Sequence, residues 1–156
     1  MVTVYRLCKT KYAANAFDGE GAFQFGGRWN SLGTRVVYTA EHLSLAALEM
    51  LVYIQDETLL STYSFIVATF YEQLITAVEN VAKLPKNWQT SPPPYAVQKI
   101  GDEWAKKQLS AVLCVPSVLI PSEANYLIDP RHADFAEITF GEPQRFVFNE
   151  RLLKVK

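Results

Sequence analysis

The sequence predicts a single domain of the α+β class over residues 1–156. The length matches one domain, and no internal stretch is polar or simple enough to mark a second unit. Strand-like and helix-like segments are interspersed, but the glycine fingerprint of a dinucleotide-binding βαβ unit is absent, which favours a mixed arrangement over a doubly wound sheet. At 49% hydrophobic residues the chain has ample material for a core.

The expected elements follow from periodicity, propensity and turn signals. Helices are expected over residues 40–54, where Thr39 offers an N-cap hydroxyl, and over residues 95–108. Residues 74–81 fit either strand or helix, and the prolines between residues 84 and 94 predict a surface connection. Strands are expected where β-branched and aromatic residues gather, at residues 2–8, 36–38, 63–71, 111–115 (continuing through 118–120), 135–140 and 145–148.

Residues 9–29 follow neither the helical nor the strand period, so they are predicted to form a long irregular loop. Long loops without secondary structure are uncommon in compact domains and often carry function. This segment is therefore the first place to expect a site.

Charge and targeting signals narrow the function classes. Fifteen Lys+Arg against 16 Asp+Glu leave a net charge of −1, which excludes the broad positive field of a nonspecific nucleic-acid binder. The N-terminal residues lack the apolar run of a signal peptide, and no segment approaches the ~20 apolar residues of a membrane span. We expect a cytoplasmic protein without membrane contact, with Cys8 and Cys114 as buried free thiols.

Most catalytic signatures are missing from the sequence. There is no Gly-x-Ser-x-Gly, no phosphate-binding Gly-x-x-x-x-Gly-Lys-Ser/Thr and no Cys-x-x-Cys. His42 and His132 are far apart and have no flanking ligand pattern. We therefore expect neither a metal centre nor a bound cofactor.

Two charged residues stand out. Glu49 lies in the helical sector of Leu45, Leu48 and Val52, a face expected to be packed, so its carboxylate needs a partner that is either structural or functional. Arg28 follows Gly26 and Gly27, where the backbone can turn tightly and a guanidinium fork suits a diphosphate. An ordinary turn with a solvated Arg is the alternative for that motif.

Two neutral residues are weaker candidates. Tyr38, at the end of a strand, offers a ring for stacking or serves as a core tyrosine. Ser117 follows Pro116 at the end of a buried strand, where its hydroxyl could donate to a ligand or cap the strand end.

Taken together and in order, these pieces resemble the RES domain, the toxin half of bacterial toxin–antitoxin pairs whose partner is an Xre-type helix-turn-helix protein. The resemblance spans nearly the whole chain. It rests on the segments Val4-Tyr5-Arg6-Leu7, Gly26-Gly27-Arg28-Trp29-Asn30, Val37-Tyr38-Thr39-Ala40, Ala46-Ala47-Leu48-Glu49, Leu84-Pro85 with Trp88, Gly101-Asp102-Glu103-Trp104, Val115-Pro116-Ser117 and Asn125-Tyr126-Leu127-Ile128-Asp129-Pro130. Asp129 stands where the family usually has Asn, a conservative change in a turn.

The resemblance implies a fold like that of ADP-ribosyltransferases, with split mixed sheets around an NAD cleft. It also implies depletion of cellular NAD by cleavage of the nicotinamide–ribose bond. Some similar proteins instead transfer ADP-ribose to a protein target. The name RES reflects an Arg, a Glu and a Ser, which correspond here to Arg28, Glu49 and Ser117.

The resemblance also assigns roles and partners. It implies that Arg28 contacts the diphosphate or the ribose hydroxyls, that Glu49 acts on the ribose or the nucleophile, and that Ser117 serves for positioning. It also implies that Tyr38 stacks on nicotinamide, that Arg6 is a second phosphate contact and that Asn125 is a further contact to NAD. NAD is the substrate, and water or phosphate is left open as the nucleophile. The expected partner is an Xre-type antitoxin that lodges near Arg28 and carries any DNA contact. Homodimer formation and a non-catalytic binding module are left open.

Overall fold

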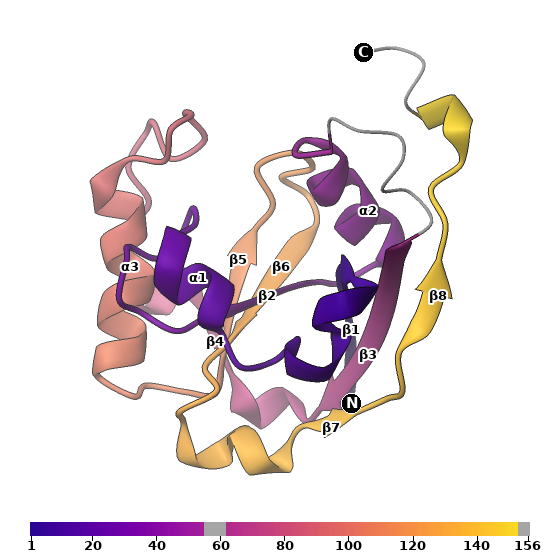
Figure 1. Cartoon of the computed structure of the whole chain (residues 1–156). Coiled ribbons are helices and arrows are strands. Elements are labelled where there is room, and N and C mark those ends of the chain that lie inside the picture. Colours follow the sequence, from indigo (N-terminus) through magenta and orange to yellow (C-terminus); the bar gives the residue numbers. More distant parts are fainter. Residues whose placement is uncertain (55–61, 153–156) are drawn as a thin grey trace.

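The structure is a computed structural model that describes residues 1–54 and 62–152 (Figure 1). It is a mixed α+β fold, as predicted, in which one eight-stranded sheet has the order β4-β5-β6-β2-β1-β3-β7 and β8 also pairs with β3. The pairing is antiparallel except between β4 and β5. The strands are β1 (Val2–Lys9), β2 (Val37–Ala40), β3 (Tyr63–Phe70), β4 (Ile75–Ala77), β5 (Val112–Pro116), β6 (Ala124–Ile128), β7 (Thr139–Phe140) and β8 (Gln144–Phe146).

Three α-helices and several short 3-10 helices complete the described chain. The α-helices are α1 (Glu20–Phe25), α2 (Leu43–Leu51) and α3 (Tyr95–Lys106). The 3-10 helices are η1 (Thr10–Asn15), η3 (Glu72–Leu74), η4 (Val78–Asn80), η5 (Ala133–Glu137) and η6 (Glu150–Leu152). No described helix is long and apolar enough to cross a membrane.

The sheet divides into two halves between β1 and β2. These strands are in register at one residue pair, Tyr5 with Ala40, whereas β1 pairs with β3 from Val2 to Lys9. Arg6 bridges the division: its Nη1 donates to the carbonyl oxygen of Tyr38 in β2 at 3.0 Å, and its Nε donates to that of Ala16 at 2.6 Å. A side chain thus supplies hydrogen bonds where the strand ladder ends.

Each half of the sheet is covered by its own helix (Figure 1). The amphipathic α3 buries Val97, Ile100 and Trp104 against the half made by β4, β5, β6 and β2, through residues such as Leu113 and Leu127. The face of α2 that carries Leu45, Ala46 and Ala47 packs with Leu7 and Tyr63 of the β1–β3 half. The two helices therefore stand on either side of the division.

A third core joins the two halves. It contains Val4 of β1, Val37 of β2, Phe70 of β3, Val112 of β5 and Ile128 of β6, all nearly inaccessible to solvent. Burial of side chains of this size stabilises the fold by roughly 1.5–3 kcal/mol each. The halves therefore form one rigid unit even though the ladder between β1 and β2 is short.

Residues 9–29 are not the irregular loop that we expected. The segment contains η1 and α1, and α1 begins where the Glu20 N–H donates to Asp18 Oδ1 at 2.9 Å, after Gly19 in the left-handed conformation (φ 74°). A six-residue helix spans fewer than two turns, so it is too short to show a hydrophobic period. The signal for this helix lies in its start, at Asp18 and Gly19, which contributes nothing to a hydrophobic period.

The predicted start of the second helix was also wrong, and its packed face was predicted only in part. Thr39 is not an N-cap but a β2 residue, whose hydroxyl donates to the Tyr126 carbonyl oxygen at 2.7 Å, and α2 begins at Leu43. Leu48 and Val52, expected to be packed, are 41% and 59% exposed. Leu45 of the same sector is buried, as predicted, so the sector that contains Glu49 is packed at its start and exposed towards the end of the helix.

Several strand predictions need correction. The strand β6 was not predicted, and residues 118–120 turn away from β5 because Ser117 Oγ accepts from the N–H groups of Leu119 and Ile120. The start of residues 135–140 belongs to η5, and residues 74–81 hold the short β4 between two 3-10 helices. The predictions for β1, β3, α3 and β5 are confirmed within one or two residues. Cys8 and Cys114 are free thiols, as predicted, but only Cys8 is buried, whereas Cys114 is half-buried.

Gly101 is predicted to be indispensable in α3. A Cβ added there would lie 1.8 Å from the carbonyl oxygen of Trp29, whereas a Cβ added at Gly21 in α1 meets nothing within 4 Å. We expect Gly101→Ala to lower the free energy of unfolding by ~1–3 kcal/mol. Gly21→Ala should raise it by up to ~1 kcal/mol, because alanine favours helix. Urea unfolding of the two variants checks this, and equal effects would contradict the close contact.

Candidate active site

A cavity of about 600 Å³ opens at the division of the sheet. Its walls come from β1, β2, α1 with the turn after it, the second half of α2, the end of β5 and the start of β6. Five of the six site residues predicted from the sequence line this cavity, namely Arg6, Arg28, Tyr38, Glu49 and Asn125. Ser117, the exception, is fully buried behind Glu49.

Glu49 reaches the cavity from α2 and is half-buried. Its Oε1 accepts a hydrogen bond from Ser117 Oγ at 2.7 Å. Burial raises the pKa of this carboxyl, while the Ser117 hydrogen bond and the positive charge of Arg28 oppose the rise. The bond and the charge both favour the ionised form, which is the form that can stabilise a developing positive charge.

Ser117 is placed to position Glu49. Its oxygen accepts hydrogen bonds from the Leu119 N–H at 3.1 Å and the Ile120 N–H at 3.2 Å, and its hydroxyl donates one to Glu49. Both acceptor lone pairs of this oxygen and its one donor hydrogen are therefore used in hydrogen bonds. Such a hydroxyl fixes the direction of the Glu49 carboxylate without leaving a lone pair aimed at the cavity.

Arg28 is held by main-chain oxygens. Its Nη1 donates to the carbonyl oxygens of Trp88 at 3.0 Å and Thr90 at 2.8 Å, both in the proline-rich connection before α3. Among the described residues, no carboxylate lies within ion-pair distance of this guanidinium. Its charge is therefore oriented but not neutralised, as an anion-binding group requires.

The turn that carries Arg28 is tightly built. Gly26 has a φ of 73°, and a Cβ added at Gly27 would lie 2.5 Å from the Tyr38 hydroxyl. That hydroxyl accepts from the Trp29 N–H at 3.0 Å and donates to Asn30 Oδ1 at 2.6 Å. Burial keeps the pKa of Tyr38 well above its usual range. Tyr38 therefore locks the turn with its hydroxyl while its side chain lines the cavity.

Two residues that support this turn were not predicted as site residues. The buried amide of Asn30 donates to the carbonyl oxygens of Ala22, Ser31 and Thr34. Asp102 on α3 accepts from both the N–H and the hydroxyl of Ser31. Both residues lie in segments that resemble the family, so the sequence marks them as part of its pattern. The sequence alone does not distinguish a side chain that supports the turn from one that binds a ligand.

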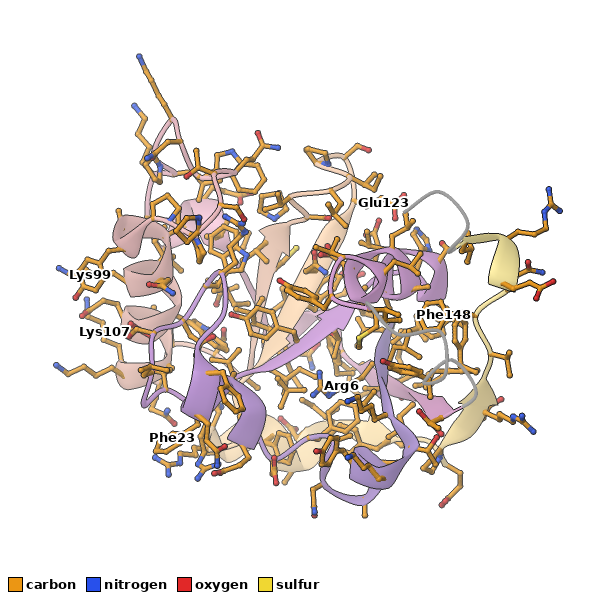
Figure 2. All side chains as sticks on the ribbon, turned by 45° about the horizontal axis from the view of Figure 1, so that its top comes forward. Arg6, Phe23, Lys99, Lys107, Glu123 and Phe148 are labelled. Carbon is orange, nitrogen blue, oxygen red and sulfur yellow. The ribbon has the colours of Figure 1, made fainter. Side chains whose placement is uncertain are left out.

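Arg6 and Asn125 complete the polar lining. Figure 2 shows Arg6 near the middle of the molecule, whereas Lys99 and Lys107 extend from the outer surface of α3. Burial lowers the pKa of Arg6 from its ordinary value, and its guanidinium donates to the carbonyl oxygens of Ala16 and Tyr38. Asn125, at the start of β6, donates to the Thr39 carbonyl oxygen at 3.4 Å. The cavity thus combines two cationic groups with one carboxylate.

A separate group of ligand-type side chains lies at the start of α2. One ligand atom each of Glu41, His42 and Glu123 lies within 4.8 Å of the other two, and His42 Nε2 is 3.4 Å from Glu41 Oε1. These residue types could coordinate a cation. None of them lines the cavity of Arg28 and Glu49, and the His42 side chain is 59% exposed. This group could not be predicted from the sequence because Glu123 is remote along the chain from Glu41 and His42.

Comparisons with known proteins agree with the fold and the motifs. The family model described as RES domain matches residues 3–149. A protein named Toxin Res from Yersinia enterocolitica is 37% identical over 150 residues, which cover 96% of this chain and 98% of that protein. A protein named Prs ADP-ribosylating toxin from Sphingobium is 34% identical over 145 residues, covering 92% and 90%.

A solved structure shows the same fold at lower identity. It is the crystal structure of the M. tuberculosis MbcT–MbcA toxin–antitoxin complex, whose matching chain aligns with a TM-score of 0.66 and 16% identity over 94% of this chain and 84% of that one. The family model and the two relatives each cover nearly the whole length described above. This chain belongs to the RES domain family.

Proposed function

We propose that this protein is the toxin of a toxin–antitoxin pair and that it cleaves the nicotinamide–ribose bond of NAD. The observation that carries the reaction is the meeting of Glu49, fixed by Ser117, with the unneutralised Arg28 in one cavity. Relatives named Toxin Res, at 37% and 35% identity over almost the whole chain, support the role as a toxin. The proposed partner is an Xre-type helix-turn-helix antitoxin.

The chemistry of this bond matches the charges of the cavity. When the bond between ribose C1′ and the nicotinamide nitrogen breaks, nicotinamide leaves as a neutral molecule with the electron pair, and positive charge develops on the ribose. A fixed carboxylate near the sugar stabilises that charge, and a cationic clamp on the diphosphate holds the substrate in place. Glu49 supplies the carboxylate, and Arg28, with Arg6 as a second cation, supplies the clamp.

The acceptor of ADP-ribose has two candidate classes. Water or inorganic phosphate gives free ADP-ribose or its 1-phosphate, with loss of one proton from the acceptor, and either product depletes NAD. Transfer to a protein is the second candidate, favoured by the 34% identity to the protein named Prs ADP-ribosylating toxin. Both outcomes begin with the same bond cleavage, so Glu49 and Arg28 have the same roles in each.

Release of nicotinamide from NAD tests the proposal directly. The purified protein should release nicotinamide in buffer without phosphate if water is the acceptor, and faster with phosphate if phosphate is. Release that requires an added protein, accompanied by covalent ADP-ribose on that protein, would identify transfer. No release under any of these conditions would exclude the proposed reaction.

Glu49→Gln should leave the fold intact and lower the rate of nicotinamide release by at least ~100-fold. The amide keeps the size of the side chain but removes the negative charge opposite the ribose. Thermal unfolding and the release rate are measured on the same preparation, with Glu79→Gln, an exposed carboxylate outside the cavity, as the matched control. A folded variant with a normal rate would show that Glu49 is structural.

Arg28→Lys should raise the KM for NAD roughly tenfold or more, although the charge is kept. Arg28 binds both carbonyl oxygens through Nη1 and keeps Nε and Nη2 to donate to an anion, whereas a lysine has one nitrogen for both tasks. Initial rates over a range of NAD concentrations measure the change, and Arg145→Lys on the exposed β8 is the control. An unchanged KM would contradict the assigned clamp.

Ser117→Ala should shift the acid limb of the rate–pH profile to higher pH. The Ser117 hydrogen bond lowers the pKa of Glu49, so its removal lets burial raise that pKa further. Because the ionised carboxylate is the active form, the rate is full above the pKa and falls as the pH drops through it. Initial rates measured against pH check this, and a melting curve is the control for folding. If the acid limb stays at the same pH, the ionisation of Glu49 does not control the rate.

A further inference from the structure

The turn that carries Arg28 lies against α3 (Figure 1). Three α3 residues on one side of the helix contact alternate residues of the turn. The pairs are Gln98 with Gly27, Gly101 with Trp29, and Asp102 with Ser31. In the first pair, Nε2 of Gln98 donates to the carbonyl oxygen of Gly27 at 3.0 Å. The helix therefore holds the main chain immediately before and after Arg28.

The hydrogen bond to Gly27 also sets the direction of a neighbouring donor. The carbonyl oxygen of Gly27 and the N–H of Arg28 belong to one trans, planar peptide group, so they point in opposite directions. Because Gln98 binds the carbonyl oxygen from the side of α3, the Arg28 N–H points away from that helix. Gly27 and Arg28 line the cavity, whereas no residue of α3, which is described throughout, does so. The Arg28 N–H is therefore on the cavity side of the turn.

This N–H differs from those next to it because it has no partner in the described part of the chain. The neighbouring N–H groups all donate to protein oxygens: Gly26 to Ala22, Gly27 to Asn30, and Trp29 to the Tyr38 hydroxyl. No hydrogen bond from the Arg28 N–H to a described residue is formed. Main-chain donors in folded proteins are nearly always paired with protein, water or ligand. A donor without a protein partner at a cavity wall is free to bind a molecule in that cavity.

We propose that the main-chain N–H of Arg28 donates to the diphosphate of the dinucleotide, and that Gln98 is the positioning residue that keeps it in that direction. This inference rests on the proposed function, in which the Arg28 guanidinium binds the same diphosphate. A diphosphate carries several anionic oxygens, so it can accept from a guanidinium and an N–H of one residue together. A hydrogen bond from a main-chain N–H to an oxyanion is shorter and stronger than one to a neutral acceptor. Gln98 lies outside the cavity lining and acts only through Gly27.

The amide proton of Arg28 reports this contact without turnover. In protein labelled with ¹⁵N-arginine, the Arg28 amide signal is assigned by its loss in Arg28→Lys. ADP, which carries a diphosphate but no nicotinamide, should move this proton signal downfield and slow its exchange with solvent. Adenosine, which has no phosphate, should do neither. The amide of Arg145 on β8, outside the cavity, is the internal control and should not respond.

Inorganic phosphate distinguishes the two sources of a phosphoryl oxygen. If the N–H binds the diphosphate, inorganic phosphate added after saturation with ADP should leave the Arg28 signal where ADP has placed it. A further shift of this signal by phosphate in the presence of ADP would assign the N–H to an acceptor anion and overturn the diphosphate contact.

Gln98→Glu tests the positioning role. A carboxylate cannot donate to the Gly27 carbonyl oxygen, so ADP binding should weaken roughly tenfold and the shift of the Arg28 amide should be lost. The KM for NAD should rise by a similar factor while kcat stays within about twofold, because the diphosphate is held equally before and during bond cleavage. Gln98→Lys keeps a donor and should restore ADP binding. Gln73→Glu, at an exposed residue of η3 outside the cavity, is the matched control for the added charge.

The outcomes separate this inference from the proposed reaction. An Arg28 amide that ignores ADP, a parent protein that does not bind ADP, or a folded Gln98→Glu protein that binds ADP like the parent would overturn it. If Gln98→Glu does not fold, the amide response of the parent protein decides. If that amide responds to ADP but NAD releases no nicotinamide, the contact stands and the proposed reaction fails. If nicotinamide is released while the amide is silent, the reaction stands and the contact fails.

Discussion

The short pairing between β1 and β2 is the constraint from which the site follows. One registered pair leaves the rest of both strands free to diverge, and the space between them becomes the cavity. Arg6 closes the gap in hydrogen bonding with its bonds to Ala16 and Tyr38. A buried cation is costly unless it is well solvated by protein dipoles, and the two carbonyl oxygens supply such dipoles. The same residue therefore holds the halves together and gives the cavity positive charge.

The charged groups of the cavity share a mode of support. Arg6 and Arg28 are held by carbonyl oxygens, and Glu49 is held by a hydroxyl. Neutral partners orient these groups without cancelling their charge, whereas ion pairs would satisfy them in the empty site and would have to be broken by a substrate. A polar site built in advance needs little rearrangement when charge develops on a bound molecule. In the described chain, ion pairs occur elsewhere, as between Arg35 and Glu20.

The sequence predicted the elements and residues that depend on local pattern. Long runs such as β3 and α3 have enough residues to show their period, and Glu49 stood out because a carboxylate occurred in an apolar helix. The errors have physical causes too. The helix α1 is too short to show a hydrophobic period. Thr39 has the side chain of a good N-cap, but it lies in β2, where its hydroxyl donates to a carbonyl oxygen of the neighbouring strand. The links from Arg28 to Trp88 and Thr90 join residues about sixty positions apart through backbone atoms, which side-chain identity does not encode.

The separation of the site residues along the chain has a consequence for synthesis of the protein. Glu49 and its partner Ser117 are 68 residues apart, and β2 finds its full-length neighbour only in β6, which ends at Ile128. A nascent chain that has not yet emerged from the ribosome as far as Ser117 lacks both the hydroxyl that orients the carboxylate and the strand β6 that pairs with β2. The cavity with its oriented carboxylate is therefore complete only after the chain has been synthesised as far as Ile128.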